Sequence, residues 1–275
     1  MASPCELLMA TDDVQIAATM LKLAIEEVSR IEQKYSRFIP HNPLWQLNHG
    51  LGKTCTIDAE TSKLLHFALQ CFELSEGLFD VTAGPLMQLW RFDGSAHIPT
   101  QPAIDRAMAL VGFERLTLSE TSLHLPEGMQ LDLGGIAKEY AADSVAYLLA
   151  ARFATISVLV NLGGDIACPV AKSPPWQVGI ENPTKLDTAA KVLSISKGAL
   201  ATSGDTRRFI EVDGKRYGHI IHPRTGYPVV DAPRSVTVIA PNCVTAGMLS
   251  TMAMLKGKAA EAFLAEQQLQ FTVYR

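Results

Sequence analysis

Short apolar segments separated by turns, rather than by regular helices, dominate the second half of the chain and constrain its fold most. Such segments, typical of β-strands, lie at 156–161, 176–181, 191–196, 208–212, 215–221 and 235–240. Asp213-Gly214 stands between the fourth and the fifth, and Asp-Gly is a strong signal for a tight hairpin turn. Because hairpins mix with helical segments without a regular strand–helix–strand alternation, we predict an α+β fold of mixed, mostly antiparallel sheets flanked by helices.

Helical segments are expected on both sides of these strands. Asp12 or Asp13 can cap a helix that extends to about Tyr35, because a carboxylate at this position accepts hydrogen bonds from the first free N–H groups. Further helices are expected at 61–77, 102–111, 134–152, 244–256 and 258–268, and further strands at 3–10 and 270–274.

The composition is that of a globular protein with a sizeable core. Of the 275 residues, 48% are apolar and 19% are charged, which excludes a disordered chain. The net charge of −4 argues against non-specific binding to nucleic acid, and no apolar run approaches the roughly 20 residues that span a membrane. We therefore expect neither nucleic acid nor a membrane as a partner.

The cysteines and the first residues favour the cytoplasm. The five cysteines are scattered and include no Cys-x-x-Cys pair, so neither a disulfide framework nor a zinc site is expected. The opening sequence MASPCE lacks the basic segment followed by an apolar one that a secretory signal requires. Reduced thiols in a cytoplasmic protein are the expectation.

Three turns containing glycine follow predicted strands, at 131–138, 161–165 and 201–205. Glycine lets backbone N–H groups approach an anion, and the first of these turns leads into a helix whose positive end favours negative charge. Lys138 lies in the first turn of that helix, where its ammonium could reach a phosphate. Each turn alone could equally be a tight bend without a ligand, but the three together favour a pyrophosphate.

Two polar residues stand in segments dense with turn signals. His219 could be a structural histidine on a strand, or it could act as a general base or contact a phosphate. Asp80 could accept hydrogen bonds from the ring of a ligand, or it could cap a turn. Aromatic residues that could stack on a flat ring, or simply pack in the core, are Tyr35, Phe38, Trp45 and Trp90.

Taken in order, these segments resemble the ApbE family of flavin transferases. The matching blocks are 1–4, 35–48, 77–86, 131–143, 160–166, 176–183, 201–205, 213–229 and 236–255. The resemblance implies one ApbE-like domain over 1–275, or two subdomains with an FAD cleft between them. It also implies an FAD:protein FMN transferase, which binds FAD and Mg²⁺, moves FMN to a Thr or Ser hydroxyl of an acceptor flavoprotein and releases AMP. The alternatives are a non-catalytic FAD-binding protein and an FAD pyrophosphatase that yields FMN and AMP.

The resemblance also implies roles for individual residues. FAD contacts are expected from Met1, Phe38, Leu78, Phe79, Asp80, Asp132, Lys138 and Ile221, with the turn Thr202, Ser203 and Gly204 as a further contact. His219 is expected to accept the proton of the attacking hydroxyl or to orient that hydroxyl. The expected ligands of Mg²⁺ are the Gly135 carbonyl and the hydroxyls of Ser250 and Thr251.

The sequence departs from the family pattern at the expected metal site. Where the family commonly has Ala-Asp-Ala-x-x-Thr, this chain reads AGMLST, so Gly247 stands in place of a carboxylate ligand. Three interpretations follow: the phosphates of FAD hold the metal, a nearby aspartate replaces the ligand (Asp143, Asp165 or Asp205), or the protein binds FAD without turnover. If the remaining site is intact, Gly247→Asp should raise FAD hydrolysis.

Two smaller departures accompany this one. Glu139 replaces the usual glycine after Lys138, and we interpret it as a residue on the helix surface. His222 replaces an aspartate, which removes a further anion near the expected site.

Overall fold

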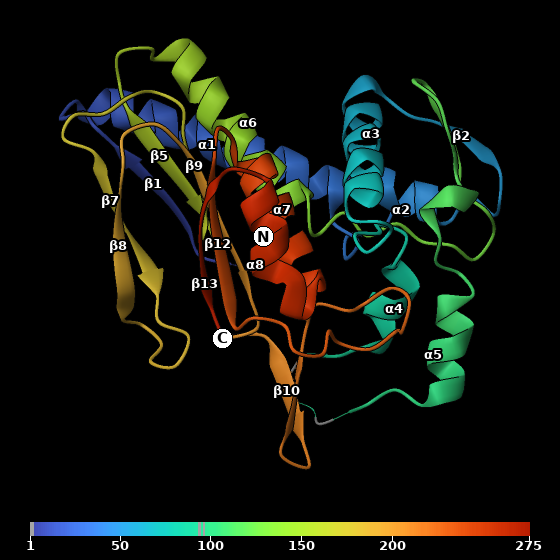
Figure 1. The fold of residues 1–275 in the computed structure, drawn as a ribbon. Coiled ribbons are helices and arrows are strands. Elements are labelled where there is room, and N and C mark those ends of the chain that lie inside the picture. The colour runs from blue at the N-terminus through green and yellow to red at the C-terminus, as the bar shows by residue number, and fades with distance from the viewer. Residues whose placement is uncertain (1–2, 93–94, 96) are drawn as a thin grey trace.

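A six-stranded antiparallel sheet forms the centre of the fold (Figure 1). The computed structural model of the chain describes residues 3–92, 95 and 97–275. In spatial order the strands are β1 (Cys5–Met9), β5 (Val158–Leu162), β6 (Asp165–Cys168), β9 (Gly198–Gly204), β12 (Ser235–Ala240) and β13 (Gln270–Tyr274). Every neighbouring pair is antiparallel, and helices flank the sheet, so the predicted α+β fold is confirmed.

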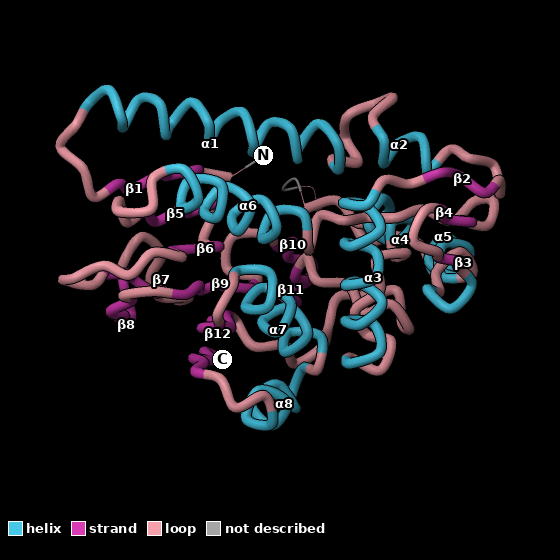
Figure 2. The backbone as a smooth tube through the Cα atoms, turned by 90° about the horizontal axis from the view of Figure 1, so that it is seen from above, coloured by secondary structure: helices cyan, strands magenta, loops and turns pink. Residues whose placement is uncertain are grey.

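Side chains alternate between the two faces of this sheet, as the period of a strand requires. Val158 and Val160 of β5 point into the core beneath the helices, whereas Leu159 points to the opposite face. On the helical face, α6 (Ala137–Arg152) lies over β5 and β6, α7 (Cys243–Leu255) lies over β9 and β12, and α1 (Val14–Tyr35) packs on α6 (Figure 2). The opposite face is covered by the hairpin of β7 (Trp176–Glu181) and β8 (Ala189–Ile195).

Smaller elements complete the fold. The helices are α2 (Pro43–Asn48), α3 (Ala59–Leu74), α4 (Gly84–Leu89), α5 (Gln101–Met108) and α8 (Ala260–Glu266), with 3-10 turns η1 (Phe113–Arg115) and η2 (Gly257–Ala259). A small sheet contains β2 (Thr54–Thr56), β3 (Thr117–Leu118) and β4 (Ser122–His124), and a separate hairpin joins β10 (Phe209–Val212) to β11 (Lys215–Gly218). In the described part of the chain, no helix is both long enough and apolar enough to traverse a bilayer.

Local signals predicted several elements correctly. Asp13 caps α1 by accepting from the N–H groups of Gln15 and Ile16, at 2.9 and 3.0 Å. The Asp213-Gly214 hairpin is also confirmed. The helix expected to begin at Gly134 begins three residues later, because 134–136 form a turn in which the Ile136 N–H donates to the Leu133 carbonyl.

The turn predicted at 201–205 is wrong for most of its length, because residues 198–204 form β9. Residues 198–200 of this strand pair with β6 and residues 199–204 pair with β12, so its polar end is held by the ladder with β12. Ala201 is fully buried beneath the helices. Small side chains suit this position because α7 packs directly on the strand.

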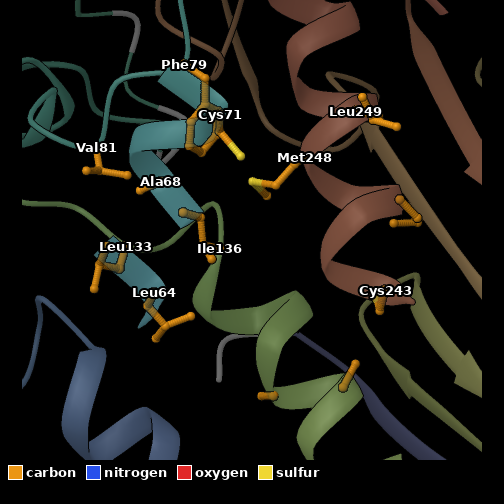
Figure 3. Packing of buried hydrophobic residues seen from close by; sticks show 14 of the residues in the cluster. Leu64, Ala68, Cys71, Phe79, Val81, Leu133, Ile136, Cys243, Met248 and Leu249 are labelled. Carbon is orange, nitrogen blue, oxygen red and sulfur yellow. The ribbon is translucent and has the colours of Figure 1, made fainter. Parts of the chain in front are cut away.

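One hydrophobic cluster links the first and second halves of the chain. Figure 3 shows Met248 on α7 facing Cys71 on α3, with Phe79 and Ile136 beside them. A polar contact also fixes α7 to α6: the Asp143 carboxylate accepts from the N–H groups of Cys243 and Val244, at 2.8 and 2.9 Å. This core contains residues from both halves of the described chain, and the single domain over 1–275 and its division into two subdomains both stay predictions.

Candidate functional site

Two of the three predicted glycine turns meet at Lys138. This residue lies at the start of α6, and its ammonium forms an ion pair with Asp165, the first residue of β6. It also donates to the Leu162 carbonyl at 3.4 Å. The Asp165 side chain is only 2% exposed, so Lys138 is its buried counter-ion. The turns at 131–138 and 161–165 are therefore joined by a charged contact.

Hydroxyl groups from β9 and α7 form a second cluster. The Ser203 hydroxyl lies 2.8 Å from that of Ser250 and 2.9 Å from that of Thr251. Ser250 in turn donates to the Gly247 carbonyl at 2.9 Å. The structure thus brings together three residues that the sequence placed in one site, although β9 and α7 are separated in the chain.

The neighbours of this cluster in β9 have mainly structural contacts. The Thr202 hydroxyl lies 2.9 Å from that of Thr237 on β12. A Cβ atom at Gly204 would lie 2.6 Å from the Arg234 carbonyl oxygen, so the close approach of these backbones requires glycine. Both residues lie on the strand that holds Ser203, and their contacts keep that strand in position.

The interpretation of Glu139 as a helix-surface residue is wrong. Glu139 is only 6% exposed and lies between α6 and α7. A Cβ atom at Gly247 would lie 2.4 Å from the Glu139 Cγ, so the side chain occupies the space over this glycine. Burial raises the pKa of Glu139, while the nearby Lys138 charge lowers it. Among the described residues, the Glu139 Oε2 atom has no hydrogen-bond partner.

His219 follows β11 and is largely enclosed. Its backbone N–H donates to the Arg208 carbonyl at 3.2 Å, and its ring faces Phe92 edge-on at 6.3 Å between ring centres. Burial, and next the charge of Arg208, lower the pKa of His219 to about 4. The Nδ1 atom is buried and has no partner in the described part of the chain. His219 is therefore neutral near pH 7, and one of its ring nitrogens has no hydrogen-bond partner among the described residues.

This low pKa predicts a pH-dependent stability. The folded protein binds fewer protons at His219 than the unfolded chain does between pH 4 and the ordinary pKa of 6.5. The contribution of His219 to stability is thus present above pH 6.5 and is lost as the pH falls toward 4. We expect His219→Gln to reduce the loss of unfolding free energy between pH 7 and pH 5 by about 1–2 kcal/mol. Urea unfolding at both pH values measures this; parallel profiles for the two proteins would contradict it.

Asp205 lies near His219, and its carboxylate forms ion pairs with two arginines. Its carboxylate lies 3.2 Å from the Arg216 Nε and 3.4 Å from the Arg234 Nε. A Cβ atom at Gly218 would lie 2.8 Å from the Asp205 Cβ, so the hairpin passes close to this side chain. The segment that carries His219 is therefore fixed by an ion-pair cluster as well as by its backbone.

Asp80 caps a turn, which is one of the two roles that the sequence allows for it; the other is a contact to the ring of a ligand. Its carboxylate accepts from the N–H and the hydroxyl of Thr82, at 2.8 and 2.6 Å, and from the Phe113 N–H at 3.2 Å. Burial raises its pKa, and these hydrogen bonds lower it. Of its neighbours, Phe79 is buried against Gly135, and Leu78 is partly buried.

Asp132 lies beside a pocket of about 250 Å³, which the sequence did not indicate. Its carboxylate accepts from the Gly134 N–H at 2.8 Å and pairs with the Arg37 Nε at 3.1 Å. Arg37 lines the pocket, and its guanidinium also lies over the ring of Phe38, which is 77% exposed. The other lining residues are Trp45, Asn48, His49, Gly84, Gln88, Gln130 and Leu131.

Most of the remaining residues that the sequence predicted to contact FAD or a flat ring are buried in the protein interior. Ile221 is buried in a small cluster with Trp90, whose indole N–H donates to the Gly226 carbonyl at 2.8 Å. Tyr35 is buried too, so Trp90 and Tyr35 pack in the interior, whereas Trp45 faces the pocket. Met1 lies outside the described residues.

The described residues contain no group of three or more His, Cys, Asp or Glu side chains arranged to hold a metal. Any cation here must use hydroxyl and carbonyl oxygens as well as a carboxylate. Within the described chain, no backbone N–H of the turn before α6 donates to the Gly135 carbonyl. The Gly135 carbonyl, the hydroxyls of Ser250 and Thr251 and the Glu139 carboxylate all offer oxygen atoms, the ligand type that Mg²⁺ prefers.

Comparisons with known proteins identify relatives of this chain. A model of the ApbE family matches residues 1–274. The FAD:protein FMN transferase of Vibrio cholerae is 32% identical over 255 residues, which cover 90% of this chain and 75% of that protein. The FAD:protein FMN transferase of Haemophilus influenzae is 33% identical over 265 residues, with 90% and 76% coverage.

Solved structures are similar over nearly the whole chain. The ApbE protein of Thermotoga maritima superposes with a TM-score of 0.89 at 29% identity, covering 98% of this chain and 90% of that one. The flavin transferase ApbE of Vibrio cholerae gives a TM-score of 0.81 at 28% identity, with 98% and 94% coverage. The family match, the sequence identity and the shared fold lead to one conclusion: this chain belongs to the ApbE family.

Proposed function

We propose that this protein is an FAD:protein FMN transferase, which moves FMN from FAD to a Thr or Ser hydroxyl of an acceptor flavoprotein and releases AMP. The relatives described above bear that name. The observation that carries the proposal is the hydroxyl cluster formed by β9 and α7, in which the Ser203 hydroxyl lies 2.8 and 2.9 Å from those of Ser250 and Thr251. Hydroxyl groups can donate hydrogen bonds to the oxygens of a pyrophosphate and can bind a divalent cation through their own oxygen atoms.

The reaction is a displacement at phosphorus. The acceptor hydroxyl oxygen forms a bond to the phosphorus on the FMN side, and the bond to the bridging oxygen breaks, so that AMP leaves with that oxygen. His219 takes the hydroxyl proton at its ring nitrogen, since burial keeps the imidazole neutral near pH 7. Lys138 and the N-terminal end of α6 offset negative charge on the phosphates.

Mg²⁺ fits the oxygen donors of this site. The expected ligands are the Gly135 carbonyl and the hydroxyls of Ser250 and Thr251, of which Thr251 lies within hydrogen-bond reach of Ser203. When bound, the cation neutralises charge on the pyrophosphate oxygens. Ser203 keeps both α7 hydroxyls oriented through its two contacts.

The remaining FAD contacts are part of the same proposal. They comprise Met1, Phe38, Leu78, Phe79, Asp80, Asp132, Lys138, Thr202, Ser203, Gly204 and Ile221. The pocket beside Asp132 supports this assignment, because Trp45 and Arg37 line it. Both side chains can contact the flat ring of a bound ligand. Asp80 and Ile221 act mainly by shaping the site, since their side chains are engaged within the protein. We also propose that the protein works in the cytoplasm.

Covalent labelling of an acceptor tests the proposal. The protein is incubated with FAD, Mg²⁺ and an acceptor that carries an Asp-x-x-Ser/Thr-Gly-Ala-Thr site. A fluorescent acceptor band should appear in a denaturing gel, and AMP should be released in equal amount. An acceptor whose target hydroxyl is removed by Thr→Ala, and a sample with chelator, are the controls. Release of FMN and AMP without labelling would indicate a pyrophosphatase, and bound FAD without either product would indicate a non-catalytic binding protein.

A further inference from the structure

The contact between Glu139 and Gly247 joins two departures from the family pattern that are far apart in the sequence. Glu139 lies in the first turn of α6, and Gly247 lies in the second turn of α7. A Cβ at Gly247 would approach the Glu139 Cγ to 2.4 Å and the Oε1 atom to 3.1 Å. The carboxylate therefore lies over the backbone of α7, in the space that any side chain at 247 would need.

Glu139 differs from the other buried carboxylates around α6. Asp143, one turn later, accepts two N–H groups at the start of α7. Asp165 has the ammonium of Lys138 as its partner. The Glu139 Oε2 and Asp165 Oδ2 atoms are both buried without a hydrogen-bond partner among the described residues. The Asp165 atom, however, is in direct contact with the Lys138 ammonium, whereas the Glu139 Oε1 atom lies 3.9 Å from that ammonium. A buried carboxylate is costly unless something supplies the missing partner.

The surroundings of this carboxylate contain further oxygen donors. Gly247, against whose Cβ position Glu139 packs, accepts the Ser250 hydroxyl at its carbonyl oxygen at 2.9 Å. Ser250 and Thr251 are both linked to Ser203. These neutral donors lack the negative charge with which a protein usually binds a hard divalent cation, and Glu139 is the nearby group that can provide it.

We propose that Glu139 supplies the anionic oxygen with which this protein holds the divalent cation of its FAD site, and that residue 247 is glycine to give Glu139 room. The inference rests on the proposed function, because it concerns the cation of that same site. In this arrangement the carboxylate reaches the site from α6 instead of α7. It replaces neither Asp143, which caps α7, nor Asp165, which pairs with Lys138.

Binding of Mn²⁺, measured by electron paramagnetic resonance in the presence of FAD, tests this inference without relying on activity. Glu139→Gln keeps the size of the side chain and removes its charge. We expect Mn²⁺ affinity to fall at least tenfold, while FAD affinity in the presence of chelator changes less than threefold. Glu73→Gln on the exposed surface of α3 is the matched control and should bind Mn²⁺ as the unmodified protein does.

A double exchange, Glu139→Gly with Gly247→Asp, provides an independent variant. It removes the crowding and supplies one carboxylate to the site from residue 247 on α7. Mn²⁺ affinity should therefore recover to within about threefold of the unmodified protein. Thermal unfolding in chelator shows whether each variant is folded.

The possible failures are distinguishable. If the unmodified protein binds no FAD, the proposed function fails and the inference fails with it. If the unmodified protein binds FAD and Mn²⁺, but Glu139→Gln binds Mn²⁺ equally well, the inference is overturned while the proposed function stands. Equal Mn²⁺ loss in Glu73→Gln would overturn it as well, because the effect would then not be specific to the site.

Discussion

Replacing Lys138 with methionine is expected to lower the free energy of unfolding by about 3–5 kcal/mol. The reason is the partner that remains: the Asp165 carboxylate is 2% exposed and would lose its cation. Methionine retains most of the aliphatic length of lysine, so loss of packing contributes little. Urea unfolding at pH 7 measures the change. A midpoint that does not move would contradict the buried ion pair.

A double variant separates the contribution of the Lys138–Asp165 ion pair to stability from the contribution of Lys138 to FAD binding. Lys138→Met combined with Asp165→Asn removes both charges and should recover most of the lost stability, because no unpaired charge stays buried. Lys258→Met is the surface control, since the pair of Lys258 with Asp231 is 80% and 52% exposed and should contribute less than about 1 kcal/mol. If Lys138 also contacts a phosphate, the stable double variant will still bind FAD more weakly.

Replacing Gly247 with aspartate alone is expected to destabilise the protein by about 2–4 kcal/mol, through overpacking and a second buried carboxylate. The new Cβ would meet the Glu139 Cγ at 2.4 Å, and the helices cannot move apart easily because the Asp143 carboxylate, in the middle of α6, holds the first N–H groups of α7. From the sequence, the same substitution tests the metal site, because a large rise in FAD hydrolysis would indicate an intact site that lacks only a metal ligand. Thermal and urea unfolding, with hydrolysis measured in parallel, distinguish the two.

The same substitution in a Glu139→Gly background is the control for this prediction. There the obstructing side chain is absent, and Gly247→Asp should cost less than about 1.5 kcal/mol, as a change that conserves volume across the helix contact does. If Gly247→Asp is equally destabilising in both backgrounds, the crowding with Glu139 is not its cause.

Elements with strong local signals could be predicted from the sequence. The Asp213-Gly214 turn and the Asp13 cap act over a few residues, so the β10–β11 hairpin and the start of α1 follow from local chemistry. Strand β9 shows where local signals are insufficient. Its polar, glycine-containing end is typical of a turn, but pairing of this end with β12 decides its conformation.

The candidate site was predictable in part, through the family resemblance. The resemblance placed Ser250 and Thr251 among the Mg²⁺ ligands, and the glycine turn at 201–205 placed Ser203 among the FAD contacts. The structure brings these three hydroxyls into contact. Burial of Glu139 could not be inferred in the same way, because it depends on how α6 packs against α7. The sequence signal for this contact was that, relative to the family pattern, residue 139 is no longer glycine while residue 247 has become glycine.

The crowded contact between these two helices also restricts the order in which the two positions can change. Starting from glycine at 139 and aspartate at 247, a first change at 139 produces two carboxylates that compete for one space. A first change at 247 produces a protein with glycine at both positions, which avoids the crowding but lacks both carboxylates. An evolutionary lineage that makes one replacement at a time therefore passes more readily through the second intermediate, so in such a lineage a weakened cation site precedes the present one.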